Sequence, residues 1–365
     1  MNIGIGKGMP TPALQALAWI LCGMTGVLLA DLATAQDSGT CKTTFQNPVM
    51  DGADPWVTRK QGFYYFCESR NGGIYISKSR KLTEPKNWTR VWQQPDEGWN
   101  SDHLWAPELH YLQGKWYIYY TAGRDGPPFI HQRSGVLEGT GQSPQDPFVE
   151  KAQLYTGANR DDTGDYSNIW SIDLTPLELG GRLYVVWSGW MQNRPDDATT
   201  QHLFIAEMAN PWTISTDRVR ISSPVQPWER GEEVDFGINE GPQVLKHEQR
   251  VFIIYSTRES WLPHYRLGQL ELTGDNPLDP ASWRKTGPVF TGTESVHGVG
   301  HASFTTSPDG SEHWIVYHSK KATDPGWDRS IRMQPFSWNP DGSPDFGEPV
   351  NTGVPLEVPS GLCSQ

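Results

Sequence analysis

Residues 114–121 read Gly-Lys-Trp-Tyr-Ile-Tyr-Tyr-Thr, in which a turn residue precedes alternating aromatic and β-branched side chains and a small polar end. Close variants of this unit begin at Gly62, Gly181, Gln249 and Glu312, so five copies follow one another at intervals of 52 to 68 residues. Each copy is apolar on both faces, which is typical of a strand that is buried between neighbouring sheets. This repeat governs the prediction of the fold.

A shorter strand is expected before each copy, and another strand after it. The preceding segments begin at Asp54, Ala106, Asp173, Glu240 and His301. The following segments are expected to begin at Ile74, Phe129, Leu203, Leu267 and Ile331. Small antiparallel sheets repeated at this interval are typical of a β-propeller, and five repeats predict five blades. We therefore expect an all-β, five-bladed β-propeller as a single domain over residues 36–365. The alternative is a large sandwich whose strands resemble one another by chance.

The composition excludes several classes of protein. The chain has 42 acidic against 30 basic side chains and a formal net charge of -12, which argues against a nucleic-acid-binding protein. Aromatic residues make up 12% of the chain and include 17 Trp, which is too much apolar surface for a disordered segment. The 37 Gly and 29 Pro favour many short strands and turns over long helices.

The N-terminal segment has the order of a secretory signal peptide. Lys7 lies in a short polar start, an apolar run follows over residues 13–30, and the small residues 33–35 end it. We expect residues 1–35 to be a signal peptide that is cleaved before Gln36, with an uncleaved membrane anchor as the alternative. No later segment is apolar enough to span a bilayer, so the mature protein is expected to be secreted or periplasmic and to have no membrane partner.

Three cysteines remain after residue 35, and export permits disulfide bonds between them. Cys41 and Cys363 lie near the two ends of the mature chain, and we expect them to pair; the alternative is two free thiols. Cys67 lies inside one of the apolar copies and is expected to be a buried strand residue.

Four of the five expected inner strands begin at an ionisable residue, namely Asp54, Asp173, Glu240 and His301. The first strand of each propeller blade lines the central channel, so these groups should converge at its mouth. Each one alone is an ordinary turn or strand-start residue. Together the three carboxyl groups suit glycoside hydrolysis, which needs one protonated carboxyl and one ionised carboxylate. A third carboxylate would raise the pKa of the acid by charge repulsion.

Several short motifs resemble glycoside hydrolase family 43. They are Ala53-Asp-Pro-Trp-Val57, Trp105-Ala-Pro-Glu-Leu109, Asp173, Asn239-Glu-Gly-Pro242 and Gly300-His-Ala-Ser303. The resemblance covers roughly residues 47–350, and it implies a five-bladed propeller that acts on arabinose- and xylose-containing polysaccharides with inversion. It also implies that Asp54 is the general base, that Glu240 is the general acid, and that Asp173 modulates the pKa of the acid.

The resemblance extends to three further residues. It implies that His301 lies near a central calcium or similar cation, held through water, while no cofactor is required for the chemistry; the alternative is a histidine that contacts substrate without a metal. Arg332 is similar to a substrate-binding arginine of the family, with a surface ion pair as its alternative. Trp105, at the channel end of the second blade, is the candidate for stacking on a sugar ring, whereas Trp56, Trp116 and Trp314 are expected in the core.

The substrate is indicated by resemblance alone. Segments 105–110, 114–119, 276–283 and 332–336 look most like exo-acting α-L-arabinofuranosidases. The expected protein is a secreted inverting hydrolase that releases L-arabinofuranose from arabinan or arabinose-containing oligosaccharides, with plant cell-wall polysaccharide as its partner. The alternatives are a β-xylosidase or endo-arabinanase of the same family, a retaining propeller glycosidase, and a carbohydrate-binding propeller without catalysis.

Overall fold

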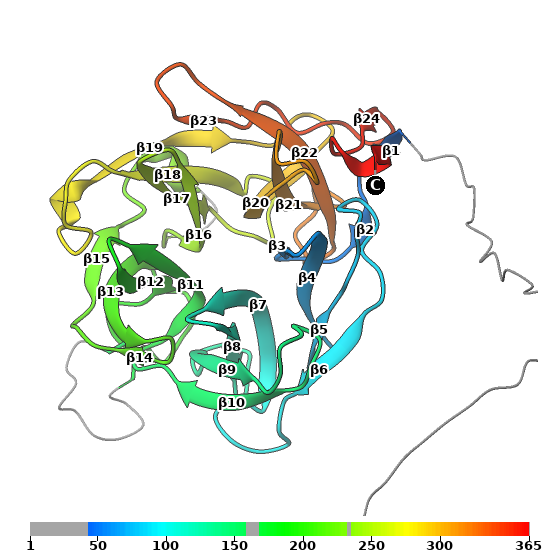
Figure 1. The fold of residues 1–365 in the computed structure, drawn as a ribbon. Coiled ribbons are helices and arrows are strands. Elements are labelled where there is room, and N and C mark those ends of the chain that lie inside the picture. The colour runs from blue at the N-terminus through cyan, green and yellow to red at the C-terminus, as the bar shows by residue number, and fades with distance from the viewer. Residues whose placement is uncertain (1–42, 158–167, 232–234, 365) are drawn as a thin grey trace, which may run out of the picture. The chain divides into compact units, whose positions relative to one another are not determined.

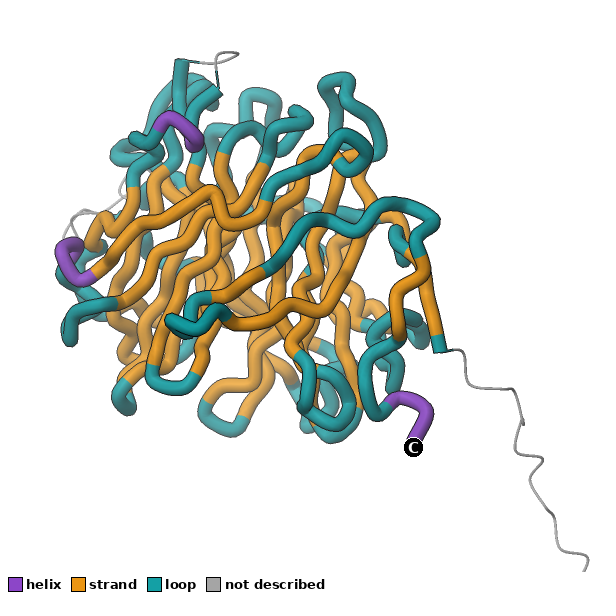
Figure 2. Tube along the Cα trace, turned by 90° about the horizontal axis from the view of Figure 1, so that it is seen from above, coloured by secondary structure: helices purple, strands orange, loops and turns teal. Residues whose placement is uncertain are grey.

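Five antiparallel sheets stand around a central channel in the computed structural model, which describes residues 43–157, 168–231 and 235–364 (Figure 1). The side view shows strands in most of this part of the chain, with loops at both ends of the strands (Figure 2). The predicted all-β, five-bladed propeller is therefore confirmed. The expected signal peptide, residues 1–35, lies outside the described residues and stays a prediction.

The blades follow one another in chain order, and each begins with its innermost strand. Blade one holds β3 (Trp56–Lys60), β4 (Phe63–Arg70), β5 (Gly73–Ile76) and β6 (Thr89–Gln93). Blade two holds β7 (Asp102–Leu112), β8 (Lys115–Gly123), β9 (Arg133–Gly139) and β10 (Phe148–Gln153). Blade three holds β11 (Ser171–Leu179), β12 (Arg182–Gly189), β13 (His202–Asn210), β14 (Thr213–Ile214) and β15 (Val219–Ser222). Blade four holds β16 (Asn239–His247), β17 (Arg250–Thr257), β18 (Arg266–Leu272) and β19 (Trp283–Phe290).

Blade five is completed by a strand from the other end of the chain. It holds β20 (His297–Thr306), β21 (His313–Lys320), β22 (Arg329–Trp338) and, at the edge of β22, β2 (Met50–Asp51) and β23 (Pro344–Asp345). The buried Asn47 extends this pairing, because its side chain both donates to the carbonyl of Met333 at 2.7 Å and accepts from the Met333 amide at 3.0 Å. A separate pair, β1 (Thr44–Gln46) and β24 (Pro355–Glu357), joins the two ends again. These contacts close the ring.

The five repeated strands are apolar on both faces because each supplies two different cores. Side chains alternate across a strand, so neighbouring residues point to opposite faces. In β4, Tyr65 and Cys67 join a cluster shared with blade two, whereas Tyr64 and Phe66 join a cluster shared with blade five. The same division gives one buried cluster between each pair of neighbouring blades. Trp116 and Trp314 belong to these cores as predicted, and Trp56 is half-buried against one of them.

One predicted strand was wrong. Residues 129–132 are not a strand, and the third strand of blade two begins at Arg133 instead. The preceding Pro127 and Pro128 have no backbone N–H to give to a strand ladder, so the segment stays a connection. The Phe129 amide donates to Oδ2 of Asp197 at 2.9 Å. Asp197 lies in the connection between β12 and β13 of blade three. This places the Phe129 side chain at one end of the channel rather than within a sheet.

One of the two cysteine predictions is confirmed, and the other is not tested. Cys67 is free and buried, as expected. Cys363 is disulfide-bonded, but Cys41 lies outside the described residues, so their pairing stays a prediction. Within the residues that the structure describes, no helix has the length and apolar character needed to cross a bilayer.

Candidate active site

A cavity of about 910 Å³ occupies the end of the channel where the innermost strands begin. All five blades contribute to its lining, which includes Asp54, Trp105, Phe129, Trp170, Asp173, Gln201, Phe236, Glu240, Trp261, His301, Trp327 and Arg329. The structure thus brings together all but one of the site residues predicted from the sequence. The remaining walls come from connections between second and third strands and from the connections that lead into β11 and β16, such as Trp170 and Phe236.

A repeated backbone irregularity aims side chains into this cavity. In or just before each innermost strand, a residue with a left-handed φ lies at an equivalent place: Asp54 (49°), Ala106 (42°), Asp173 (56°), Gly241 (54°) and His301 (46°). In blades two to five this residue falls where the strand register shifts, as in a β-bulge. Bulges re-aim side chains and are frequent beside active sites. The left-handed backbone is therefore repeated five times at the rim of the channel, and it is strained at all of these places except Gly241.

Blade four departs from the other blades by one residue. The equivalent of Asp54 is Gly241 rather than Glu240, so Glu240 takes the place that Trp105 takes in blade two. A Cβ atom at Gly241 would approach the His301 ring at 3.2 Å, which is tight. Glycine at this position therefore leaves room for His301 and lets the preceding carboxyl reach the cavity.

Asp54 is held in its ionised form by three cationic or polar neighbours. Its Oδ1 lies 3.1 Å from Nη1 of Arg329, 3.2 Å from Nδ1 of His318 and 3.3 Å from Nδ1 of His301. Burial alone would raise the pKa of Asp54, but Arg329 and the two histidines overcome it and hold that pKa well below the usual range. Asp54 is therefore suited to accept a proton from water.

Glu240 and Asp173 form a second carboxyl pair, in which the pKa of each group is raised to about 7. Both side chains are buried, with 8% and 4% exposure, and burial is the largest cause that raises the pKa of each. Mutual repulsion and the charge of Asp54 add to this. The Asp173 carboxylate accepts from the Gly241 amide at 2.9 Å, which ties it to the residue next to Glu240. One strongly acidic and one weakly acidic carboxyl group in one cavity are what a general base and a general acid require.

Tyr265 is the hydrogen-bond partner that limits the pKa of Glu240. Its hydroxyl donates to Glu240 Oε1 at 2.9 Å, and burial keeps that hydroxyl protonated because it raises the pKa of Tyr265 well above its usual value. We expect Tyr265→Phe to raise the pKa of Glu240, because the ionised form loses a donor. The alkaline limb of kcat/KM against pH should move to higher pH, which initial rates across the pH range will measure.

Asp173→Asn provides the control of opposite sign. It removes the neighbouring negative charge that disfavours ionisation of Glu240, so the same limb should move to lower pH. In the Tyr265→Phe variant the fold should be kept, because the ring of Tyr265 stacks on His318 at 5.4 Å and phenylalanine retains this contact. Shifts in the same direction for both variants would contradict the assignment of the limb to Glu240.

Aromatic side chains surround the carboxyl groups on two sides. Trp105 and Phe129 meet edge to face at 5.1 Å on the side of blade two. Trp170, held by a hydrogen bond to the carbonyl of Phe129 at 2.7 Å, stacks on Trp190 at 4.5 Å. Such faces pack well against the C–H groups of sugars. The predicted position of Trp105 in the cavity therefore agrees with the structure, while its contact with substrate stays a prediction.

Arg332 is the one predicted site residue that the structure does not bring to the cavity. It is 3% exposed, and its guanidinium donates to the carbonyl of Val350 at 3.0 Å and to Thr352 Oγ1 at 3.1 Å. Arg329 lies at the start of β22, at the cavity end, and contacts Asp54 instead. Arg332 lies three residues further along β22 than Arg329, away from the cavity end, so only Arg329 is at the level of the cavity.

The described residues do not fit a directly bound calcium ion. Calcium takes six to eight oxygen ligands, whereas His301 offers nitrogen and the nearby Asp54 carboxylate is already bound to Arg329. No group of three His, Cys, Asp or Glu side chains in the described part of the chain is arranged around a metal position. A cation held through water near His301 stays a prediction.

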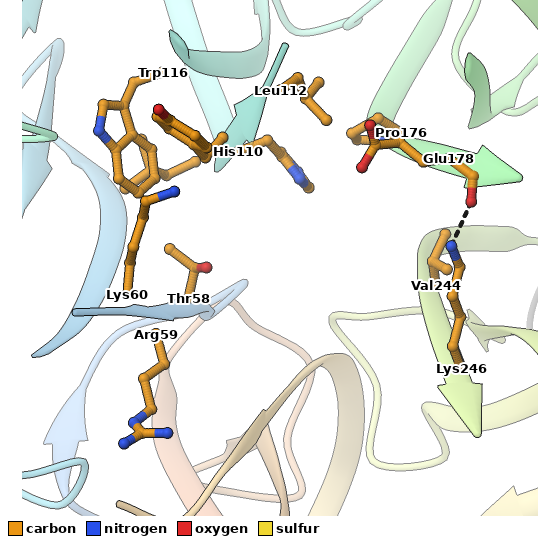
Figure 3. A pocket seen from close by; sticks show the side chains of 12 residues that line it. Thr58, Arg59, Lys60, His110, Leu112, Trp116, Pro176, Glu178, Val244 and Lys246 are labelled. Atoms are coloured by element: carbon orange, nitrogen blue, oxygen red, sulfur yellow. Dashed lines mark hydrogen bonds between the residues drawn. The ribbon is translucent and has the colours of Figure 1, made fainter. Parts of the chain in front are cut away.

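The opposite end of the channel is a smaller cavity of about 340 Å³ (Figure 3). The far ends of β3, β7, β11 and β16 line it, with Lys60, His110 and Lys246 among the polar side chains. Lys246 donates to the carbonyl oxygen of Glu178, whose side chain is the single carboxyl group in this lining. Glycoside hydrolysis uses a pair of carboxyl groups, and this lining holds only one, so the other end of the channel suits that chemistry.

The fold and the three carboxyl groups define a five-bladed propeller with an acid–base cavity at one end of its channel. The sequence profile of Glycosyl hydrolases family 43 matches residues 45–344, and the chain belongs to this family. An extracellular exo-α-(1→5)-L-arabinofuranosidase of Streptomyces avermitilis is 34% identical, over 94% of this chain and 70% of that protein. α-L-Arabinofuranosidase 43 of Humicola insolens is 35% identical over 84% of this chain, which spans 63% of that protein. The crystal structure of α-L-arabinofuranosidase from Lactobacillus brevis superposes with a TM-score of 0.74 at 32% identity, covering 85% of this chain and 98% of that one.

Proposed function

We propose that the protein is a secreted exo-acting α-L-arabinofuranosidase that releases L-arabinose from arabinan and arabinose-containing oligosaccharides of plant cell walls. The observation that carries the proposal is the contrast between two carboxyl groups in one cavity: Asp54 lies against Arg329 and two histidines, which hold its pKa low, whereas Glu240 is buried beside Tyr265 and its pKa is raised to about 7. The arabinofuranosidase relatives support the choice of sugar, and the relative named extracellular supports export.

The proposed reaction inverts the anomeric carbon in one step. Glu240 donates its proton to the glycosidic oxygen as the bond to the anomeric carbon breaks. Asp54 takes a proton from the water that attacks the opposite face of the sugar. Asp173 keeps Glu240 protonated and holds the Gly241 amide, while Arg329 keeps Asp54 ionised. The products are free arabinose and a shortened chain with a new hydroxyl end.

Product analysis tests the proposal on linear arabinan, branched arabinan and xylo-oligosaccharides, with Glu240→Gln as the inactive control. We expect free arabinose as the sole early product from both arabinans and none from the control. Xylose would overturn the substrate in favour of a β-xylosidase, and early oligosaccharides would indicate an endo-arabinanase. Binding of these glycans without release of any sugar would indicate a carbohydrate-binding propeller.

A further inference from the structure

A second hollow of about 700 Å³ adjoins the active-site cavity between blades three and four. The two spaces share Ala198 and Phe236, which form the saddle between them. The remaining lining residues are Met191, Gln192, Arg194, Thr199, Thr200, His202 and Asp235. Its volume lies within the range typical of sites for small ligands, about 300–1,000 Å³. None of the residues outside the saddle takes part in the proposed acid–base chemistry.

The hollow lies on the side of Glu240 that faces away from Asp54. In a ring of five blades, blade one faces the gap between blades three and four across the channel, as β3 faces β11 and β16 in Figure 1. The wall of the hollow is tied to the strand of the acid: the Gln201 amide donates to Gly237 O at 3.0 Å, and the Asn239 amide donates to Gln201 O at 3.2 Å. Asn239 directly precedes Glu240.

An inverting reaction places the leaving group on this side. The attacking water and the departing oxygen lie on opposite faces of the anomeric carbon, with the base beside the water and the acid beside the leaving oxygen. The leaving chain should therefore extend away from Asp54, past Glu240 and over the saddle into the hollow. We propose that the hollow binds the one or two sugar residues of the chain that follow the cleaved bond. This inference rests on the proposed function, because it assigns the position of the leaving chain in that reaction.

The lining suits a neutral sugar chain. Met191 is half-exposed, as an apolar contact for a sugar ring would be, and Arg218 fixes its backbone by donating to its carbonyl at 2.7 Å. His202 bonds to Ser223 Oγ at 3.0 Å, and burial together with nearby arginines lowers its pKa to about 4, so it is neutral at physiological pH. Amide, hydroxyl and neutral imidazole groups recognise sugar hydroxyls, and the two charged side chains of the lining, Arg194 and Asp235, can do so as donor and acceptor. The fixed backbone reduces the ordering that binding requires.

The test compares substrates of different length in one double variant. Met191→Ala with Arg194→Ala should lower kcat/KM for (1→5)-linked arabinopentaose by on the order of tenfold, mainly through KM, as expected for lost binding contacts. The rate with 4-nitrophenyl α-L-arabinofuranoside, whose leaving group ends at the saddle, should stay at the wild-type value. Arg90→Ala, an exposed arginine on the outer strand of blade one, is the matched control and should change neither rate.

Three results would overturn the proposal. They are an unchanged rate on arabinopentaose, an equal loss on both substrates, or a length-dependent loss in Trp327→Ala rather than in the double variant. Trp327 lies on the rim of blade five and forms a pair with Trp261 at 5.5 Å, so it is the rival platform for the leaving chain. The wild-type enzyme separates the two proposals. If it cleaves another oligosaccharide and not arabinan, the proposed function fails. The loss of rate on long against short substrates of that other sugar would then still test the hollow.

Discussion

Replacing Glu240 with glutamine should lower kcat on arabino-oligosaccharides by about 10²–10⁴-fold, the usual contribution of a general acid. Glutamine has nearly the same shape and can still accept the hydrogen bond from Tyr265, but it has no proton to donate. A sugar alkoxide is a poor leaving group unless it is protonated as the bond breaks. Initial rates of arabinose release at saturating substrate measure the loss.

The leaving group provides the control for Glu240→Gln. Nitrophenolate departs without a proton, so the variant should retain much more of its activity on 4-nitrophenyl α-L-arabinofuranoside than on arabinotriose. A thermal unfolding curve that matches the wild type would show that the fold is intact. Equal losses on the two substrates would remove Glu240 from the role of acid and point to a role in binding.

The fold could be predicted from the sequence because one feature recurs five times. A strand apolar on both faces needs a neighbour on each side, and five such strands at similar intervals satisfy one another only as a ring. Alternation in β4, where Tyr64 and Tyr65 enter different cores, is visible directly in the residue pattern. The third strand of blade two was predicted to begin too early, because Phe129 and Ile130 resemble strand residues; Phe129 instead lines the cavity, and Ile130 packs with Trp170 and Trp190.

The site was predicted less completely, since register within a strand depends on local backbone geometry. Asp54, Asp173 and His301 share a left-handed position that spacing alone brings to one level, but Gly241 shows that the acid is offset by one residue. Arg329 and Arg332 illustrate the same limit, because both are arginines in one strand and only their level decides which faces the channel.

The partners of the site groups come from a connection and from a place in the repeated second strand where only one of the five copies has histidine. Tyr265 lies just before β18, and His318 lies in β21 among buried aromatic residues. Nothing in the residue pattern separates His318 from a core histidine. A polar residue near the cavity end of an otherwise apolar strand is the one sign that could have indicated it.

Asp54→Asn should lower kcat by about 10²–10⁴-fold on every substrate, including 4-nitrophenyl α-L-arabinofuranoside. Activation of the attacking water is needed whether or not the leaving group requires a proton, so an activated substrate cannot compensate. Asparagine keeps the size of the side chain but cannot accept a proton from water. Rates on the nitrophenyl substrate, followed by its colour, measure the effect against that of Glu240→Gln.

The contrast between the two variants decides which carboxyl group is the acid and which is the base. If Asp54 is the base, its variant loses activity on both substrates, whereas the Glu240 variant recovers on the activated one; the reverse pattern would exchange the two roles. The electrostatics argue for the first assignment, because Arg329 and two histidines hold the pKa of Asp54 low while burial raises the pKa of Glu240 to about 7. Asp54 cannot act as the acid, because its low pKa leaves it without a proton to donate. Arg329, absent from the motifs, is therefore a residue that fixes which carboxyl group is the base.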